Sequence, residues 1–555
     1  MLDPALSAES QCEDLRPDEW VYLAEGNLHV LLAYRGQCAR FRDHVLRLLK
    51  VRHGGEKKAL YDPRQERHYV EHVVGPVLGH QYLETGTSLT VTPSFLNEVA
   101  IQIMPHRPAR RAVYDLDKTA CTVECLRDLT RFFPPMPHAT LTAPPTCQLT
   151  LEIKPKAGYH SRSRLVPPAR RFKFQESRFS LMQRYRFAVL ETQALEPEWG
   201  DLREGPNWGY SPPDLFSGEV EKMTRTLQAL IRNPQIFFQF FVGPRLVYGR
   251  GERQVGLARN AARQLLLPGG ACAEGFGAES EEDPLDTLME AVAQVLQQEC
   301  LLPRLLSLQR LDVLDVEGAG AVMERLVELC GGEEAAAQAL LQEEVLQARL
   351  LRTGAEEEGP GGESMSAMAR RLEAALGLGP CGARGGSGKG STCEGEPAGF
   401  VLEQQHKEAL ATVQRLSQAE CLFLLHRWLI ALGASDCSIM LAIRRCPDEA
   451  ALPLTRFSPV LGQDASSLQP LESFCQSASE PGLLSFRPTP PAQGGRERGA
   501  VRLAYAMHVV DLGPKPPTKV LSKARLEDGI IAAAQRAGSS AKEASQRSSG
   551  AVSTH

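Results

Sequence analysis

The sequence lacks the features of several protein classes. It has no run of about 18 apolar residues, so no membrane-spanning helix is predicted. The N-terminus, Met1-Leu2-Asp3-Pro4, is acidic and has no signal-peptide core. The 14 cysteines have neither disulfide-framework spacing nor a C-x-x-C pair, which is typical of reduced thiols and leaves a structural zinc without support. We therefore expect a soluble intracellular protein, located in the cytoplasm and nucleus.

The chain also lacks a strong excess of positive charge. Its formal net charge is −5, whereas general nucleic-acid binders are usually basic, so nucleic acid is not an expected partner. With 555 residues, 43% of them hydrophobic, the chain can bury a large core and form more than one domain or lobe.

The N-terminal part has a β-rich pattern. Two apolar runs between Trp20 and Tyr34 flank Glu25-Gly26-Asn27, which predicts a hairpin whose turn can bring backbone N–H groups close to a phosphate. A further strand, Val45–Lys50, carries Arg47 within its apolar run. Arg47 either reaches nucleotide phosphates from the strand or is a surface arginine with a buried stem.

Positive charge is concentrated in one part of the chain. The predicted strand 147–154 delivers Lys154 and Lys156, and arginines and one lysine then dominate the stretch from Arg162 to Arg186. Within it, Arg178, Met182 and Arg186 have the four-residue spacing that places side chains on one helix face. This stretch is consistent with a site for a polyanion, a solvated basic patch or an RNA-binding surface, although few aromatic residues interrupt it.

Low-complexity sequence marks the segment boundaries. The Gly/Ser-rich string near Gly388-Lys389 fails as a P-loop, because Ala383 stands where the first glycine is required and Gly390 follows the lysine. We read it as a flexible insert. The predicted units are an N-terminal part (1–146), a mixed part (147–353), this insert (354–398), a part with two further strands (399–535) and a disordered tail (536–555).

Two aspartates lie next to predicted strands that are separated by a long excursion. Asp436 precedes Ile439–Ile443, and Asp511 follows Val501–Val510, with Lys515 four residues later. In phosphoryl transfer one carboxylate orients or deprotonates the attacking hydroxyl, and another holds Mg²⁺. An aspartate at such a position, taken alone, is more often a cap or turn residue.

Taken together, several short motifs resemble the inositol-pentakisphosphate 2-kinases. They are Glu152-Ile153-Lys154-Pro155-Lys156-x-Gly158, Asp436-Cys437-Ser438-Ile439-Met440 and Asp511-x-x-x-Lys515-Pro516, with supporting stretches such as Asp115-Leu116-Asp117 and Leu311-Asp312-Val313-Leu314-Asp315. The resemblance implies an α/β (α+β), two-lobed kinase-like fold with a β-rich N-lobe and a larger mixed C-lobe that contains a helical inositide-binding subregion. It implies an enzyme that uses ATP and Mg²⁺ to phosphorylate the 2-hydroxyl of inositol 1,3,4,5,6-pentakisphosphate. We expect this enzyme to be a monomer.

The resemblance also assigns roles to residues. Asp436 would be the base and Asp511 the metal ligand; Lys515 would serve catalysis and the substrate. The expected substrate contacts are Arg111, Lys154, Lys156, Arg178 and Arg186. The expected nucleotide contacts are Gly26, Asn27, Arg47 and Asp128.

Three departures from the family pattern stand out. Met182 replaces a histidine, Gln235-Ile236-Phe237-Phe238-Gln239 replaces polar phosphate contacts, and Gly513 replaces an acid. These changes favour, as an alternative, a catalytically weak scaffold that binds inositol phosphates. The kinase hypothesis requires Asp436, Asp511, Lys154 and Lys156 to converge at one place.

Overall fold

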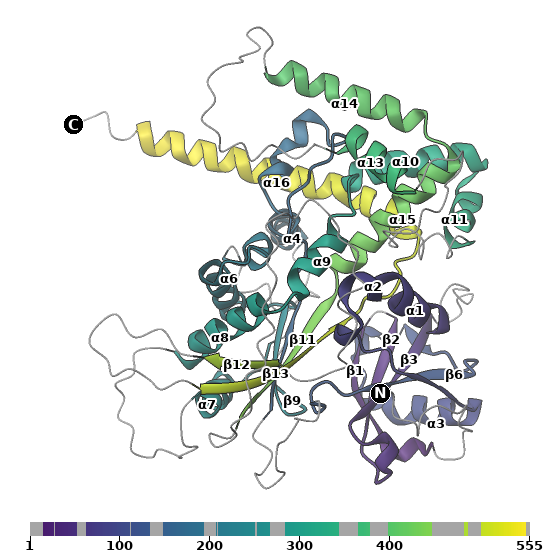
Figure 1. The fold of residues 1–555 in the computed structure, drawn as a ribbon, viewed down its shortest axis with the longest axis vertical. Coiled ribbons are helices and arrows are strands. Elements are labelled where there is room, and N and C mark those ends of the chain that lie inside the picture. Colours follow the sequence, from purple (N-terminus) through teal and green to yellow (C-terminus); the bar gives the residue numbers. More distant parts are fainter. Residues whose placement is uncertain are drawn as a thin grey trace.

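The computed structural model describes most of the chain between Leu15 and Gly550. The described ranges are 15–26, 28–52, 63–111, 113–133, 148–193, 207, 209–249, 252–266, 283–342, 365–377, 398–446, 482–486 and 501–550. Most of the predicted 354–398 insert therefore lies outside the described residues, as does Asn27. The described part is an α+β fold built on two antiparallel sheets (Figure 1).

The first sheet lies in the N-terminal part and has the strand order β1-β2-β3-β6-β4, with β5 paired to β3. Its strands are β1 (Trp20–Glu25), β2 (His29–Tyr34), β3 (His44–Arg52), β4 (Thr87–Thr90), β5 (Tyr114–Leu116) and β6 (Thr122–Arg127). The predicted hairpin is confirmed, because β1 pairs antiparallel with β2 across Gly26. Helix α3 (Pro93–Ile103), capped by the Thr92 hydroxyl, buries Phe95, Leu96, Val99 and Ile103 in the core of this sheet.

The second sheet has the order β10-β9-β8-β7-β11-β13-β12. Its strands are β7 (Leu149–Ile153), β8 (Phe238–Val242), β9 (Arg245–Gly249), β10 (Glu252–Arg253), β11 (Ser438–Arg445), β12 (Gly482–Phe486) and β13 (Val501–Val510). Ile153 pairs with Ile439, and Ile439 pairs with Val509. This register places the last residues of β7, the first residues of β11 and the last residues of β13 side by side, at the same end of these three strands.

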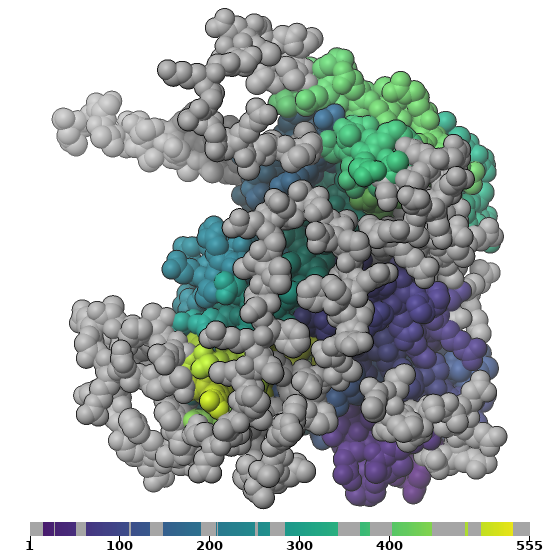
Figure 2. Space-filling view, in the orientation of Figure 1, coloured from purple at the N-terminus to yellow at the C-terminus, as the bar shows by residue number. Residues whose placement is uncertain are grey.

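Of the remaining helices, the first two lie above the first sheet, and the others lie beside the second sheet or above it (Figure 1). In chain order they are α1 (Pro63–Tyr69), α2 (Gly75–Leu78), α4 (Arg178–Gln193), α5 (Pro212–Leu215), α6 (Val220–Arg232), α7 (Val255–Leu266), α8 (Pro284–Gln298), α9 (Leu301–Gln309), α10 (Asp315–Cys330), α11 (Glu333–Gln342), α13 (Met365–Leu376), α14 (Ala398–Gln414), α15 (Gln418–Ser435) and α16 (Thr518–Gly550). In Figure 2 the purple N-terminal part and the green helices lie at opposite ends of the visible face.

The sequence predicts a break of the helical region at Pro303, and the structure agrees: α8 ends at Gln298, and Pro303 lies in the first turn of α9, where no intrahelical N–H bond is lost. Two other details differ from the sequence-based expectation. The sequence predicts one helix over 401–432, but the structure has two, because a capping box of Ser417 and Glu420 starts α15. The backbone of α16 is helical as far as Gly550, although disorder is predicted from 536; alanine, glutamine and lysine there favour a helix.

None of the described helices combines the length and the apolar character that a membrane crossing requires.

Candidate active site

The strand register places the predicted lysines and aspartates together. The Lys154 ammonium, just past β7, donates a 2.7 Å hydrogen bond to Ser438 Oγ at the start of β11. Ser438 in turn donates to Glu152, and Lys154 Nζ lies 3.8 Å from Asp511 Oδ2. The ends of three strands therefore contribute side chains to a single polar cluster, as the kinase hypothesis requires.

Lys156 and Asp436 form the second half of this cluster. Lys156 Nζ lies 2.8 Å from Asp436 Oδ1, and Asp436 caps the end of α15. Burial opposes ionisation of this carboxyl, but Lys156, with Lys515 and Lys523 nearby, holds the pKa of Asp436 well below its usual range. Asp436 is therefore an anion at neutral pH, available to accept a hydrogen bond from a hydroxyl.

The cationic state of Lys154 is also secured. Burial alone would lower the pKa of Lys154, but Glu152, Asp511 and Asp436 together raise it above the ordinary value. Both Lys156 and Asp511 have positive φ, 60° and 64°, in a region that non-glycine residues seldom occupy. The chain thus tolerates backbone strain at two of the four predicted site residues, which is common at functional sites.

Helix α16 adds a lysine that the sequence-based reasoning missed. Lys523 lies close enough to Asp436, Lys156, Lys519 and Arg178 to interact electrostatically with all four. Burial and its cationic neighbours lower the pKa of Lys523 to about 8, against the opposing effect of Asp436. Lys519 and Lys523 are four residues apart within α16, a spacing that places both on one helix face and was a signal for this second cation.

The atypical 235–239 stretch forms an aromatic support for the cluster. Phe237 is buried, and its ring centroid lies 5.4 Å from Lys156 Nζ and 5.7 Å from Arg186 Cζ. Gln235 is buried and exchanges amide hydrogen bonds with Gln183 of α4. The polar contacts expected here from the family are therefore replaced by a ring beneath two of the predicted substrate cations.

Much of the arginine-rich stretch is engaged inside the protein. Arg178 does lie on a helix with Arg186, but its guanidinium pairs with Glu527 of α16 at 2.8 Å. Arg170 pairs with Asp528, and Arg184 pairs with Glu176. The concentration of positive charge is thus explained in part by ion pairs with distant acids, and Arg178 has a structural partner besides its predicted substrate role.

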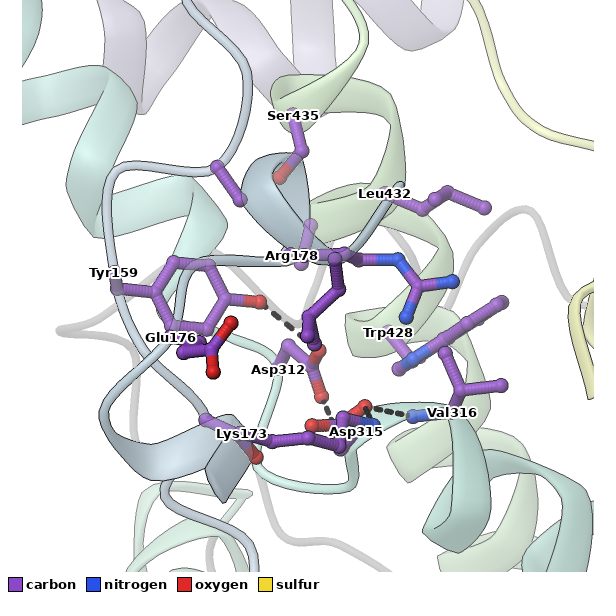
Figure 3. A pocket seen from close by; sticks show the side chains of 14 residues that line it. Tyr159, Lys173, Glu176, Arg178, Asp312, Asp315, Val316, Trp428, Leu432 and Ser435 are labelled. Atoms are coloured by element: carbon purple, nitrogen blue, oxygen red, sulfur yellow. Dashed lines mark hydrogen bonds and ion pairs between the residues drawn. The ribbon is translucent and has the colours of Figure 1, made fainter. Parts of the chain in front are cut away.

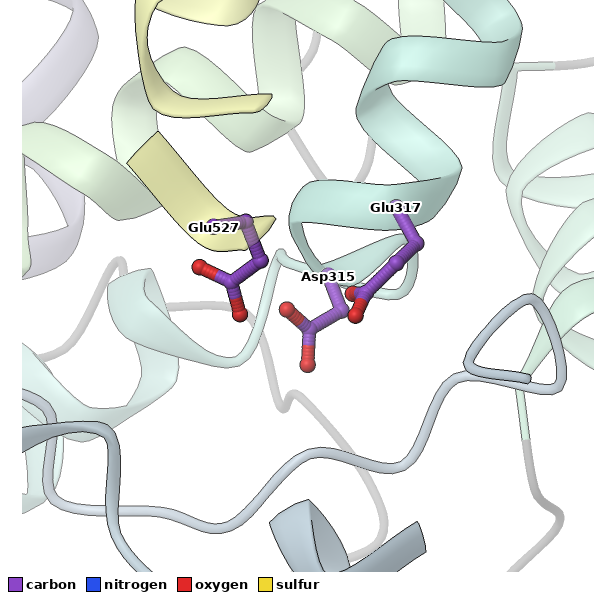
Figure 4. A group of neighbouring side chains, drawn as sticks. All are labelled: Asp315, Glu317 and Glu527. Carbon is purple, nitrogen blue, oxygen red and sulfur yellow. The ribbon is translucent and has the colours of Figure 1, made fainter. Parts of the chain in front are cut away.

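Lys173 is the centre of this ion-pair network. Its ammonium lies 2.7 Å from Asp315, 2.7 Å from Glu317 and 2.8 Å from Glu527. Among the described residues, only these three carboxylates are grouped closely enough to hold a metal ion (Figure 4). Because the lysine already neutralises them, we read the group as a structural ion-pair cluster, and not as a metal centre.

A small cavity of about 70 Å³ lies between this network and the end of α15 (Figure 3). Ser435 and Ala157, the neighbours of Asp436 and Lys156, line the cavity together with Arg178 and Trp428. The Tyr159 hydroxyl donates a hydrogen bond to Asp312. Burial and the nearby Asp315 carboxylate raise the pKa of Asp312 to about 6. The cavity therefore adjoins the candidate site and belongs to the same polar region.

The predicted nucleotide contacts lie on or beside the first sheet. Arg47 of β3 pairs with Glu124 and, at 2.9 Å, with Glu66 of α1. The Gly26 carbonyl accepts a hydrogen bond from buried Lys50, which also pairs with Glu25. These contacts fix the turn, and the nucleotide roles of Gly26 and Arg47 stay predictions.

Two other predicted contacts have local partners. The Asp128 carboxylate accepts hydrogen bonds from the backbone N–H and hydroxyl of Thr130, as in a turn, so its nucleotide role is unsupported by its side-chain geometry. The Arg111 carbonyl accepts from Arg107, and the Arg111 side chain lies near Lys50. The substrate role of Arg111 stays a prediction, and Asn27 lies outside the described residues.

A carboxylate fixed by lysines beside a second, exposed carboxylate is the type of site that phosphoryl-transfer enzymes use. A family model described as inositol-pentakisphosphate 2-kinase matches residues 22–528. Because the match covers most of the chain, this protein belongs to the inositol-pentakisphosphate 2-kinase family.

Individual relatives agree with this assignment. A protein named inositol-pentakisphosphate 2-kinase from Arabidopsis thaliana is 25% identical over 334 residues, covering 55% of this chain and 69% of the relative. The relative of the same name from Danio rerio is 29% identical over 245 residues, covering 43% of this chain and 46% of its own length. One from Cryptococcus neoformans is 25% identical, covering 58% of this chain and 69% of its own. The chain thus spans less than half of the Danio rerio relative.

Proposed function

We propose that this enzyme transfers the γ-phosphoryl group of ATP to the 2-hydroxyl of inositol 1,3,4,5,6-pentakisphosphate, giving inositol hexakisphosphate. Family membership and the names of the relatives support a kinase acting on inositol pentakisphosphate. The observation that carries the proposal for this chain is the convergence of Asp436 and Asp511 with Lys154 and Lys156 at one end of the strands β7, β11 and β13.

Asp436 is the proposed base. Its carboxylate is ionised and about half exposed, so a substrate hydroxyl can donate a hydrogen bond to it. A low pKa suits this task, because the transition state of phosphoryl transfer is loose and demands orientation of the nucleophile more than early removal of its proton. Lys156 holds the carboxylate in place while its own charge attracts a substrate phosphate.

Lys154 and Lys515 are the proposed contacts for the transferring group. Lys154 stays cationic beside Asp511, and the Lys515 charge reaches Asp436. Two ammonium groups that are already fixed beside the transferring phosphoryl group stabilise the negative charge of the transition state without rearrangement.

Asp511 is the proposed ligand of Mg²⁺. Its side chain is 59% exposed and lies at the long distance of 3.8 Å from Lys154, so a carboxylate oxygen, the donor type that Mg²⁺ prefers, is accessible. When bound, Mg²⁺ neutralises charge on the nucleotide phosphates. We further propose a two-lobed kinase-like arrangement, in which the Gly26 turn and Arg47 of the first sheet face the nucleotide.

Incubation of the purified chain with ATP, Mg²⁺ and a panel of inositol phosphates tests the proposal. We expect transfer to inositol 1,3,4,5,6-pentakisphosphate, with the new phosphate assigned to position 2 by ³¹P NMR. Asp436→Asn should lower kcat by roughly 100-fold or more. Asp286→Asn, which removes an exposed partner of Arg232, should leave kcat unchanged. Tight binding of the pentakisphosphate without transfer would instead identify a scaffold.

A further inference from the structure

One buried glutamine connects the two segments that carry Lys156 and Asp436. Gln309, the last residue of α9, is fully buried. Its Nε2 group donates to the Lys156 carbonyl at 2.9 Å and to the Ala434 carbonyl at 3.1 Å. Its Oε1 accepts from the Gly158 N–H at 2.8 Å. Both N–H donors and the carbonyl of the amide are therefore used, each on a backbone group.

These backbone groups lie next to the proposed chemistry. Ala434 is in the last turn of α15, two residues before Asp436, and Lys156 and Gly158 belong to the loop after β7. The Lys156 carbonyl belongs to a residue with a φ of 60°, which needs support from its surroundings to persist. Gln309 supplies that support and joins the loop to the helix end.

We propose that Gln309 is a positioning residue, which fixes the Lys156 loop against the end of α15 and so sets the 2.8 Å contact between Lys156 and Asp436. Gln309 acts through the backbone of these two segments. Its own amide contacts neither the Lys156 ammonium nor the Asp436 carboxylate. The inference rests on the proposed function, because it gives Asp436 the role of base and Lys156 that of a substrate contact.

The chemistry of the site requires an amide at this position. A methionine of similar size would remove the side-chain partner of the Lys156 carbonyl and of the Gly158 N–H, and it would leave the Ala434 carbonyl with the Cys437 thiol, a weak donor. Such a loss is costly in a protein interior. A glutamate would retain the shape but direct carboxylate oxygens at two carbonyl oxygens, which repel them. Either change should release the Lys156 loop from the end of α15.

Release of the loop has a specific electrostatic consequence. Lys156 is the strongest influence that lowers the pKa of Asp436, so separating the two groups raises that pKa toward its usual value. Asp436 would then lose its charge at a higher pH on acidification, and the acid limb of the pH–rate profile would move upward. A change in overall stability alone would not move this limb.

The test compares Gln309→Glu and Gln309→Met with Tyr248→Phe. Tyr248 is the control, because its buried hydroxyl donates to the Ile231 carbonyl at 2.8 Å in the last turn of α6, as Gln309 donates to the Ala434 carbonyl in the last turn of α15. All three variants should melt at lower temperature. Only the Gln309 variants should lower kcat/KM by roughly 10- to 100-fold and shift the acid limb upward by about one pH unit. Equal pH profiles for Gln309→Met and Tyr248→Phe would overturn the inference.

A crystal structure of Gln309→Glu separates this inference from the proposed function. We expect Lys156 Nζ to lie beyond hydrogen-bonding distance of Asp436 in that variant. An unchanged 2.8 Å contact would overturn the positioning role, whether or not the unaltered chain transfers phosphate. Absence of transfer by the unaltered chain, with a displaced Lys156 in the variant, would refute only the proposed function.

Discussion

At the scale of single residues, Phe237 shows how an apolar side chain can serve a site for a polyanion. Its ring lies beneath both Lys156 and Arg186, and cations over an aromatic face gain roughly 0.5–1 kcal/mol each at partly exposed sites. Phe237→Leu keeps the buried volume apolar but removes the ring. We expect KM for the inositol phosphate to rise by roughly 2- to 10-fold with little change in kcat.

Steady-state kinetics with the inositol phosphate varied at saturating ATP measure this effect. Phe486→Leu is the control, because it removes a fully buried ring from β12. It should lower stability and leave KM for the inositol phosphate as it was. Equal KM values for Phe237→Leu and the unaltered chain would mean that the ring does not organise the two cations.

The lowered pKa of Lys523 predicts that substrate binding weakens at alkaline pH. Because its pKa is lowered to about 8, the ammonium is present below that pH and is lost as the pH rises through it. A polyanionic substrate binds the charged form better, so its KM should increase above pH 8. An arginine at this position stays charged, so KM of the Lys523→Arg variant should not change between about pH 7 and about pH 9.5. A parallel rise in both proteins would contradict the assignment.

At the scale of the elements, the three site strands were predictable and their ion-pair partners were not. The runs Val501–Val510 and Ile439–Ile443 are apolar and long enough to indicate strands, so the positions of Asp436 and Asp511 at strand ends followed from the pattern. The partners of Lys173 lie more than a hundred residues away, on α10 and α16. Local periodicity carries no information on such contacts, so the cationic stretch was read mainly as a surface for an anion.

The same limit explains the missed residues of the site. Gln309 and Glu66 have ordinary sequence surroundings, and only the packing of α9 and α1 gives each its contacts with the segments that carry the aspartates. Strand register, by contrast, follows from burial of one face, which the apolar runs encode.

The buried ion-pair cluster fastens α16 to α4 and α10 (Figure 1). Glu527 is almost fully buried and contacts both Lys173 and Arg178. Glu527→Ala would remove the carboxylate paired with Arg178 and leave Lys173 with Asp315 and Glu317 only. Loss of such charge-assisted hydrogen bonds lowers the free energy of unfolding by roughly 1.5–3 kcal/mol. Chemical denaturation measures the loss. Asp528→Ala is the control from the next position: it removes an exposed partner of Arg170 and should cost at most about 1 kcal/mol. Similar losses for both variants would show that the cluster does not hold the helix.

At the scale of the whole molecule, the two sheets are linked beside the candidate site through Glu66 and Gly513. Glu66 of α1 is held by Arg47 of β3, and a Cβ atom added at Gly513 would lie 2.5 Å from Glu66 Oε1. Gly513 follows Asp511 by two residues, so the contact joins the proposed nucleotide side to the proposed metal ligand. The glycine found where the family has an acid therefore makes room for a carboxylate from another element.

Gly513→Asp tests whether this link matters for catalysis. The new side chain would overlap the Glu66 carboxylate and repel it, so we expect the free energy of unfolding to fall by roughly 1–3 kcal/mol. Displacement of Glu66 also disturbs Arg47, and kcat/KM for ATP should fall with it. Glu66→Ala combined with Gly513→Asp removes the overlap and restores one carboxylate beside Asp511, so it should recover part of the activity that Gly513→Asp loses. If the double variant were as inactive as the sum of the single changes predicts, the two positions would be energetically independent and the link between the sheets would have no role in nucleotide use.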